Sequence, residues 1–137
     1  MAETGVNWLA VLVAAAAGFA FGAAWYMTLG KAWMAALGRS AAEIRASGQG
    51  PLAFATAAAA QLVMAFFLAG LVGHLEAGAP TLAGALTTGF FVWLAFIATT
   101  MMVNHRFQGA RWSLTAIDAG HWLGVLLVQG LAIGLFG

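Results

Sequence analysis

A carboxylate and an imidazole lie one helical turn apart in the stretch LTAIDAGHWLGVLL, residues 114–127. Asp118 and His121 are three positions apart, which places both side chains on one face of a helix. Such a pair can share a proton, so it could form a proton or cation relay, or one wall of a small polar pocket. The same pair could instead be a structural network that fastens two helices together. Its neighbours are almost all apolar, so a buried Asp118 requires partners.

The partners expected for Asp118 are His121, and Arg106 or Arg111 reaching inward from a nearby loop. Other polar residues are predicted at a similar depth in the protein. The complete predicted polar network comprises Asp118, His121, Asn104, His105, Arg106, Arg111, Gln61 and Tyr26.

Other chemistry is less well supported by the spacing. His105, Asp118 and His121 could supply three metal ligands, but they form no compact ligand motif, and no metal site is predicted. No cofactor is predicted either, although His121 as an axial ligand to a haem or related tetrapyrrole stays an alternative. Ser113 completes the residue types of a catalytic triad with Asp118 and His121, yet three positions on one helix give poor triad geometry. No catalytic residue is predicted, and an enzyme is the less favoured class.

The composition predicts a protein whose solvent is the lipid bilayer. Of 137 residues, 64% are hydrophobic and only 7% are charged, whereas soluble domains carry about 25% charge. The chain has no cysteine, which excludes disulfides and thiolate nucleophiles. The net charge is +1 without a basic block, so a nucleic-acid partner is excluded.

Four apolar stretches are long enough to cross a hydrocarbon core, which requires about 20 helical residues. Pro51 and Pro80 lie where the second and third helices should begin. We therefore predict an all-α integral membrane four-helix bundle forming one domain over residues 1–137. The first span has no basic leader or cleavage motif and should remain in the mature protein. The predicted spans are 5–28, 52–73, 81–103 and 112–136, with loops at 29–51 and 104–111.

The basic residues predict the orientation. Lys31, Arg39 and Arg45 lie between the first two spans, and Arg106 and Arg111 between the last two. All five Lys and Arg residues are therefore on one side. The positive-inside rule places both basic loops in the cytoplasm and both termini outside, in a bacterial inner membrane.

The longer basic loop should contain short helices. Ser40 and Glu43 have the spacing of a capping box, which predicts that a helix begins there. Trp33, Met34 and Leu37 form an apolar face that predicts a separate amphipathic helix on the cytoplasmic surface, with Trp33 inserted in the membrane. An ordinary ordered loop is the alternative.

Small residues predict where helices pack closely. Gly18 and Gly22 form a GxxxG motif, and alanines recur every four residues in the second span. The fourth span carries Asp118 and His121 on one face and small residues on the opposite face, so we expect protein on both sides. Because four spans offer few neighbours, we expect a homo-oligomer or a larger complex. The predicted packing residues are Gly18, Gly22, Ala57, Ala65, Gly120 and Gly124.

Several motifs resemble a family of bacterial membrane proteins grouped as domain of unknown function 1761. They are VNWLAVLVAAAAGFAFGAAWY, GKAWM, TTMMVNHRF and IDAGHWL. The resemblance covers nearly the whole chain and implies a small integral membrane protein with no known activity. Family members often carry a Ser-Pro insertion where Met27-Thr28-Leu29 stands here. A tyrosine is commoner at the position of His121, which implies that an imidazole is not obligatory there.

Three classes of function follow. The favoured class is a structural or accessory subunit that self-assembles or docks into a larger membrane complex. The first alternative is an oligomeric transporter or channel for a small solute or protons, with a polar cytoplasmic vestibule around Asp118. The second is a cofactor-binding membrane protein. No substrate can be named from these residues.

Overall fold

The computed structural model describes residues 6–137, and in this part four helical spans are long and apolar enough to cross a membrane. The third span is a composite of α4, a π-helical segment η1 and α5. The predicted all-α bundle is therefore confirmed, although the predicted start of the first span at residue 5 lies outside the described residues. The elements are α1 Trp8–Leu37, α2 Ala41–Ala46, α3 Gly50–Leu75, α4 Leu82–Val92, η1 Trp93–Ala98, α5 Thr99–Phe107 and α6 Trp112–Phe136.

The first helix is longer than predicted. α1 runs without a break to Leu37, where Gly38 ends it in a left-handed conformation with φ of 77°. The prediction of a separate amphipathic helix around Trp33 is therefore wrong. No residue between the apolar span and Gly38 breaks a helix, so propagation by one hydrogen bond per residue continues. At 30 residues, α1 is about 45 Å long and exceeds a hydrocarbon core of about 30 Å.

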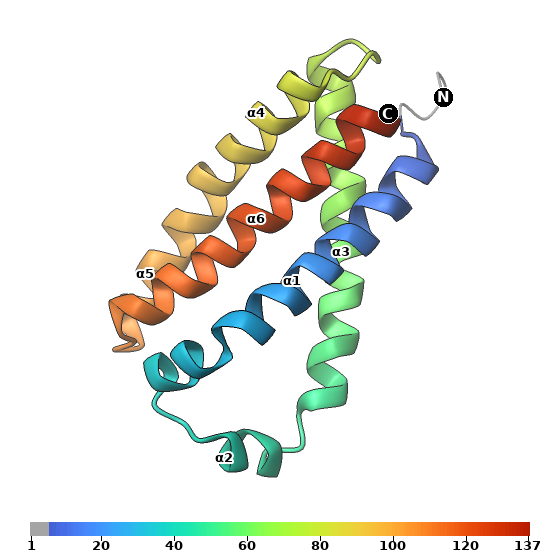
Figure 1. The fold of residues 1–137 in the computed structure, drawn as a ribbon. Helices are drawn as coiled ribbons and strands as arrows, with labels where there is room; N and C mark the ends of the chain where they lie inside the picture. Colours follow the sequence, from blue (N-terminus) through green and yellow to red (C-terminus); the bar gives the residue numbers. More distant parts are fainter. Residues whose placement is uncertain (1–5) are drawn as a thin grey trace.

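The capping box predicted in the loop is present at the start of α2. The hydroxyl of Ser40 accepts from the backbone N–H of Glu43 at 3.1 Å, and the backbone N–H of Ser40 donates to the Glu43 carboxylate at 3.0 Å. The backbone bond from Ser40, then the Ser40 side chain and the charge of Arg39, hold the pKa of Glu43 below its ordinary value. α2 joins the ends of α1 and α3 (Figure 1).

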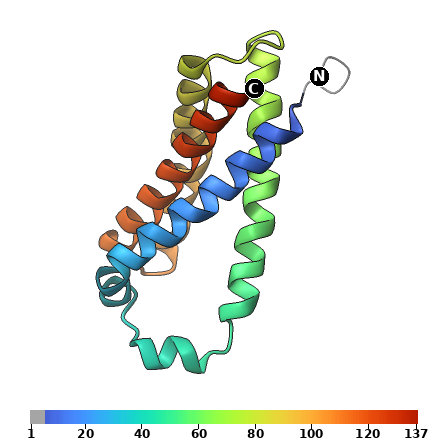
Figure 2. The same cartoon turned by 45° about the vertical axis from the view of Figure 1, so that its right-hand side comes forward.

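α6 is the central helix of the bundle, with α1 on one side and α4 on the other (Figures 1 and 2). α1 and α3 lie side by side near the chain termini and separate toward α2. The end of the bundle that carries α2 and the α5–α6 turn holds the five Lys and Arg residues; it is called the basic end below. The opposite end, with the C-terminus, is called the terminal end.

Glycines let α6 approach α4 at backbone distance. A Cβ atom on Gly130 would lie 2.9 Å from the carbonyl oxygen of Ala85, and one on Gly134 would lie 2.6 Å from the Cα of Leu82. Both contacts are shorter than real Cβ atoms tolerate, so only glycine fits without moving a helix. This close approach fixes the α4–α6 register.

The small residues predicted on the other face of α6 pack against aromatic rings of α1. A Cβ on Gly120 would lie 3.0 Å from the Trp25 ring, and one on Gly124 would overlap the Phe21 ring. α6 is thus covered by α1 and α4 of the same chain, and a second copy is not needed to explain its two packed faces.

Candidate functional site

The phenol of Tyr26 is the direct partner of Asp118. Tyr26 Oη in α1 donates to Asp118 Oδ1 in α6 at 2.6 Å, and both residues are half-buried. The Tyr26 ring also lies against the imidazole of His121, with ring centroids 4.9 Å apart. A short bond from a hydroxyl to a carboxylate is among the stronger hydrogen bonds in proteins. The bond joins two spans that are distant in the sequence.

The arginines do not pair with Asp118, which corrects the prediction for that carboxylate. Arg106 donates to the hydroxyl of Thr115 at 2.6 Å, and its guanidinium lies 3.5 Å from the centroid of the Trp112 ring. Arg111 donates to a backbone carbonyl at the end of α1. The physical reason is depth: Asp118 lies about 9 Å along α6 from its first residue, whereas Thr115 and Trp112 lie closer to the α5–α6 turn.

His105 contacts the same Thr115 hydroxyl as Arg106 and is likewise separated from Asp118. Its Nδ1 lies 2.7 Å from Thr115 Oγ1. Sequence reasoning missed Thr115, a buried hydroxyl that joins α5 to α6. Thr115 lies three residues before Asp118, about one helical turn away, and this spacing could have indicated that it belongs to the same polar region.

His121 is buried between aromatic rings and the α1 backbone. A Cβ on Gly22 would lie 2.7 Å from His121 Nε2, so the imidazole fills the space that this glycine leaves. Nδ1 is buried and has no hydrogen-bond partner among residues 6–137.

Two glutamines form a second polar contact further along the bundle. Gln129 Nε2 in α6 donates to Gln61 Oε1 in α3 at 2.7 Å, and both side chains are buried. Gly18 of α1 closes this site, because a Cβ there would overlap the Gln61 amide oxygen. Gln61 is therefore separated from Asp118, since Gln129 lies about 16 Å further along α6. Gln129 was not among the predicted site residues, although it shares the polar face of α6.

Two tryptophans hold α6 from opposite sides. Trp25 Nε1 of α1 donates to the carbonyl of Ile117 at 3.0 Å, and Trp93 Nε1 of η1 donates to the carbonyl of Ala119 at 2.8 Å. These bonds flank Asp118. The sequence analysis did not predict either bond.

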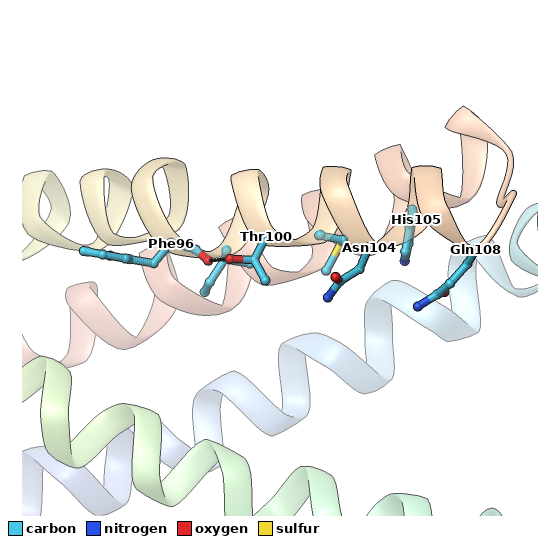
Figure 3. Close-up of a pocket in the computed structure, with 7 residues that line it drawn as sticks. Phe96, Thr100, Asn104, His105 and Gln108 are labelled. Atoms are coloured by element: carbon cyan, nitrogen blue, oxygen red, sulfur yellow. Dashed lines mark hydrogen bonds between the residues drawn. The ribbon is translucent and has the colours of Figure 1, made fainter.

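A groove runs along one face of η1 and α5 (Figure 3). The π-helical geometry of η1 is typical of functional sites. Asn104 was predicted in the Asp118 network but is exposed in this groove. The groove has a volume of about 340 Å³ and is lined by Phe96, Ile97, Thr100, Met101, Asn104, His105 and Gln108.

No cluster of three or more His, Asp or Glu side chains that could hold a metal ion occurs in the part of the chain that the structure describes.

Residues 9–134 match the family described as protein of unknown function DUF1761. The chain belongs to this family. The resemblance noted in the sequence motifs is thereby confirmed. No curated protein matches the chain, and no solved structure matches it. In this DUF1761 protein, Tyr26 binds Asp118 and Gln61 binds Gln129 between helices, whereas Asn104 and Gln108 in the η1–α5 groove are exposed.

Proposed function

We propose that this DUF1761-family protein is a structural or accessory membrane subunit that receives a further transmembrane helix beside the basic-end half of α3. The helix would come from a second copy or from a partner in a larger complex. We also propose that the basic end lies in the cytoplasm of a bacterial inner membrane, because all five Lys and Arg residues gather there.

The observation that carries this proposal is a small-residue ridge on α3 that is buried along only half of its length. Ala65 and Ala69 are 0% and 6% exposed. The same four-residue spacing continues to Ala57, which is half-buried, and Ala53, which is exposed. Small residues at this spacing allow two helices to approach closely. Within the described chain, the basic-end half of the ridge lacks the close helical neighbour that the other half has.

The arrangement of the helices agrees with this reading. α1 and α3 separate toward α2 (Figures 1 and 2), and α1 exposes Ala20, Ala23 and Ala24 along this stretch. Two alanine-rich helix segments that diverge from each other offer a third helix contacts on both sides. The internal polar contacts of the bundle then serve to hold this frame rigid.

Photocross-linking can test the proposal with two matched positions on α3. Phe54 and Phe67 are 66% and 68% exposed, and only Phe54 lies in the basic-end half. A benzoylphenylalanine at position 54 should cross-link to a polypeptide in the native membrane, and one at position 67 to lipid. Mass spectrometry of the adduct then distinguishes a second copy from a different partner. Lipid adducts alone at both positions would overturn the proposal.

A proton or small-solute transporter is the second candidate, and one observation favours it. His121 Nδ1 and Gln129 Oε1 are buried without a hydrogen-bond partner in the described residues, and both lie on the α6 face that carries Asp118. His121 could exchange a proton with Asp118, and the Gln129 carbonyl could accept a hydrogen bond from a polar solute on this face. Asp118→Asn should then abolish proton flux into loaded vesicles while the fold persists; unchanged flux would exclude this function.

A further inference from the structure

We propose that the η1–α5 groove binds one anionic phospholipid from the leaflet at the basic end. One of its two acyl chains would lie along Phe96, Ile97 and Met101, and its headgroup beside Asn104 and Gln108. The groove is formed by η1 and α5 and shares no lining residue with the α3 ridge, so this proposal can be tested separately from the function proposed above.

The length of the groove matches one leaflet. From Gln108 to Phe96 the helix rises about 18 Å, and half of a hydrocarbon core is about 15 Å thick. The groove therefore begins at the basic end and stops near the middle of the bilayer. A single acyl chain ends at that depth, whereas a partner helix that crosses the membrane would require a contact face along the whole span.

The groove is lined by apolar side chains at one end and by polar side chains at the other, which matches the two parts of an amphiphile. Phe96 lies at one end of the groove, and Asn104 and Gln108 lie at the end near the α5–α6 turn (Figure 3). Ile97 follows Phe96 in the lining. Thr100 lies between them, with its hydroxyl donated to the Phe96 carbonyl at 2.6 Å. The amide N–H groups of Asn104 and Gln108 can donate to phosphate and ester oxygens. The apolar residues can cover methylene groups.

The charge near the polar end favours an anionic headgroup. Arg106 and Arg111 flank the α5–α6 turn beside Gln108. The Arg106 guanidinium is held by Thr115 and the Trp112 ring and does not line the groove, so its charge acts on the headgroup over a distance and not by direct contact. The carboxylates at this end are Glu43, held in the capping box of α2, and Asp118, held by Tyr26. Basic residues at a membrane surface attract anionic lipids.

Native mass spectrometry can test the site in protein extracted from vesicles of equal phosphatidylglycerol and phosphatidylcholine with identical acyl chains. The wild type should retain one phosphatidylglycerol in preference to phosphatidylcholine. Thr100→Trp should fill the groove and lower the lipid-bound fraction about tenfold. Val103→Trp is the matched control, because Val103 lies on the same helix, is 55% exposed and does not line the groove.

The headgroup assignment has its own variant. Asn104→Leu with Gln108→Leu should keep a bound lipid but remove the preference for phosphatidylglycerol. Both side chains are exposed, so circular dichroism should show an unchanged helical fold. Equal retention of the two lipids by the wild type, or equal lipid loss in Thr100→Trp and Val103→Trp, would overturn the proposal. A polypeptide cross-linked from position 100 would also overturn it.

Discussion

α5 and α6 are joined by one short turn and both carry polar residues, but their surroundings differ. Of the 18 residues that form the most apolar stretch of α6, 39% are buried. The corresponding share is 11% in the span that contains η1 and α5. Asp118 and Gln129 of α6 each bind a side chain of another helix. Asn104 and Gln108 of the third span are exposed.

A polar residue in a membrane helix can therefore have two different roles. Where neighbouring helices enclose it, its hydrogen bond stabilises the bundle, because the alternative is an unsatisfied group in an apolar medium. Where no helix of the chain covers it, it is free to bind a lipid or a partner. Neighbours, and not residue type, separate the two cases.

The largest expected effect comes from the glycine contacts that enclose α6. Gly130→Leu should lower the free energy of unfolding by about 3 kcal/mol or more, because backbone atoms of α4 cannot move away as a flexible side chain can. Thermal unfolding in mild detergent measures the change.

Gly30→Leu is the control for that variant, since a Cβ at Gly30 meets no atom within 4 Å. It should leave stability unchanged or raise it by up to about 1 kcal/mol, because glycine is a poor helix former. Equal destabilisation by the two variants would contradict the packing argument.

Matched amide substitutions test whether burial decides the use of a polar group. Gln129→Leu leaves the buried Gln61 amide without its side-chain partner and should cost about 2 kcal/mol of stability. Asn104→Leu removes an exposed amide and should change stability by less than about 0.5 kcal/mol. Reversible denaturation in the same detergent measures both; similar values for the two would remove the distinction between α6 and α5.

A smaller effect is expected for the Tyr26–Asp118 bond. A double-mutant cycle with Tyr26→Phe and Asp118→Leu, each of which removes the bond, should give a coupling energy of about 1 kcal/mol, the usual size for hydrogen bonds between membrane helices. The cycle is measured by equilibrium unfolding. Strict additivity of the two substitutions would show that this bond does not stabilise α6 against α1.

The smallest effect is expected in α2, where the Glu43 side chain is exposed to solvent. Because the pKa of Glu43 is lowered in the folded protein, its stabilising contribution is present above the ordinary carboxyl pKa and is lost as the pH falls through the lowered value. NMR titration of Glu43 should show this depressed pKa, and Ser40→Ala should return it toward the ordinary value. The return should be partial, because the backbone N–H of residue 40 still donates to Glu43; an unchanged pKa would show that the Ser40 hydroxyl does not contribute to the shift.

Local signals in the sequence predicted much of the fold for identifiable reasons. Runs of apolar residues predicted the four spans, and Ser40 with Glu43 predicted α2, because a capping box is read within four residues. The length of α1 was missed, since the prediction ended the helix with the apolar run, whereas no proline ends the helix between residue 28 and Gly38.

The candidate site was predicted less well, because its contacts join distant parts of the chain. The face shared by Asp118, His121 and Gln129 follows from helical periodicity alone. The partners Tyr26 and Gln61 depend on the register between helices, which glycine contacts set. Arg106 and Arg111 were close in sequence to Asp118 but are held nearer the turn.

The sequence by itself determined that this is a membrane protein, where its helical spans lie, which end of the bundle is basic, and to which family it belongs. Those properties depend on composition and on local hydrogen bonds within a helix. The tertiary structure alone decided which polar groups are enclosed and which are exposed. Enclosure requires a second helix at contact distance. That distance cannot be read from one helix alone. It is set when the helices meet, because Gly18, Gly22 and Gly130 have no side chain and allow close approach.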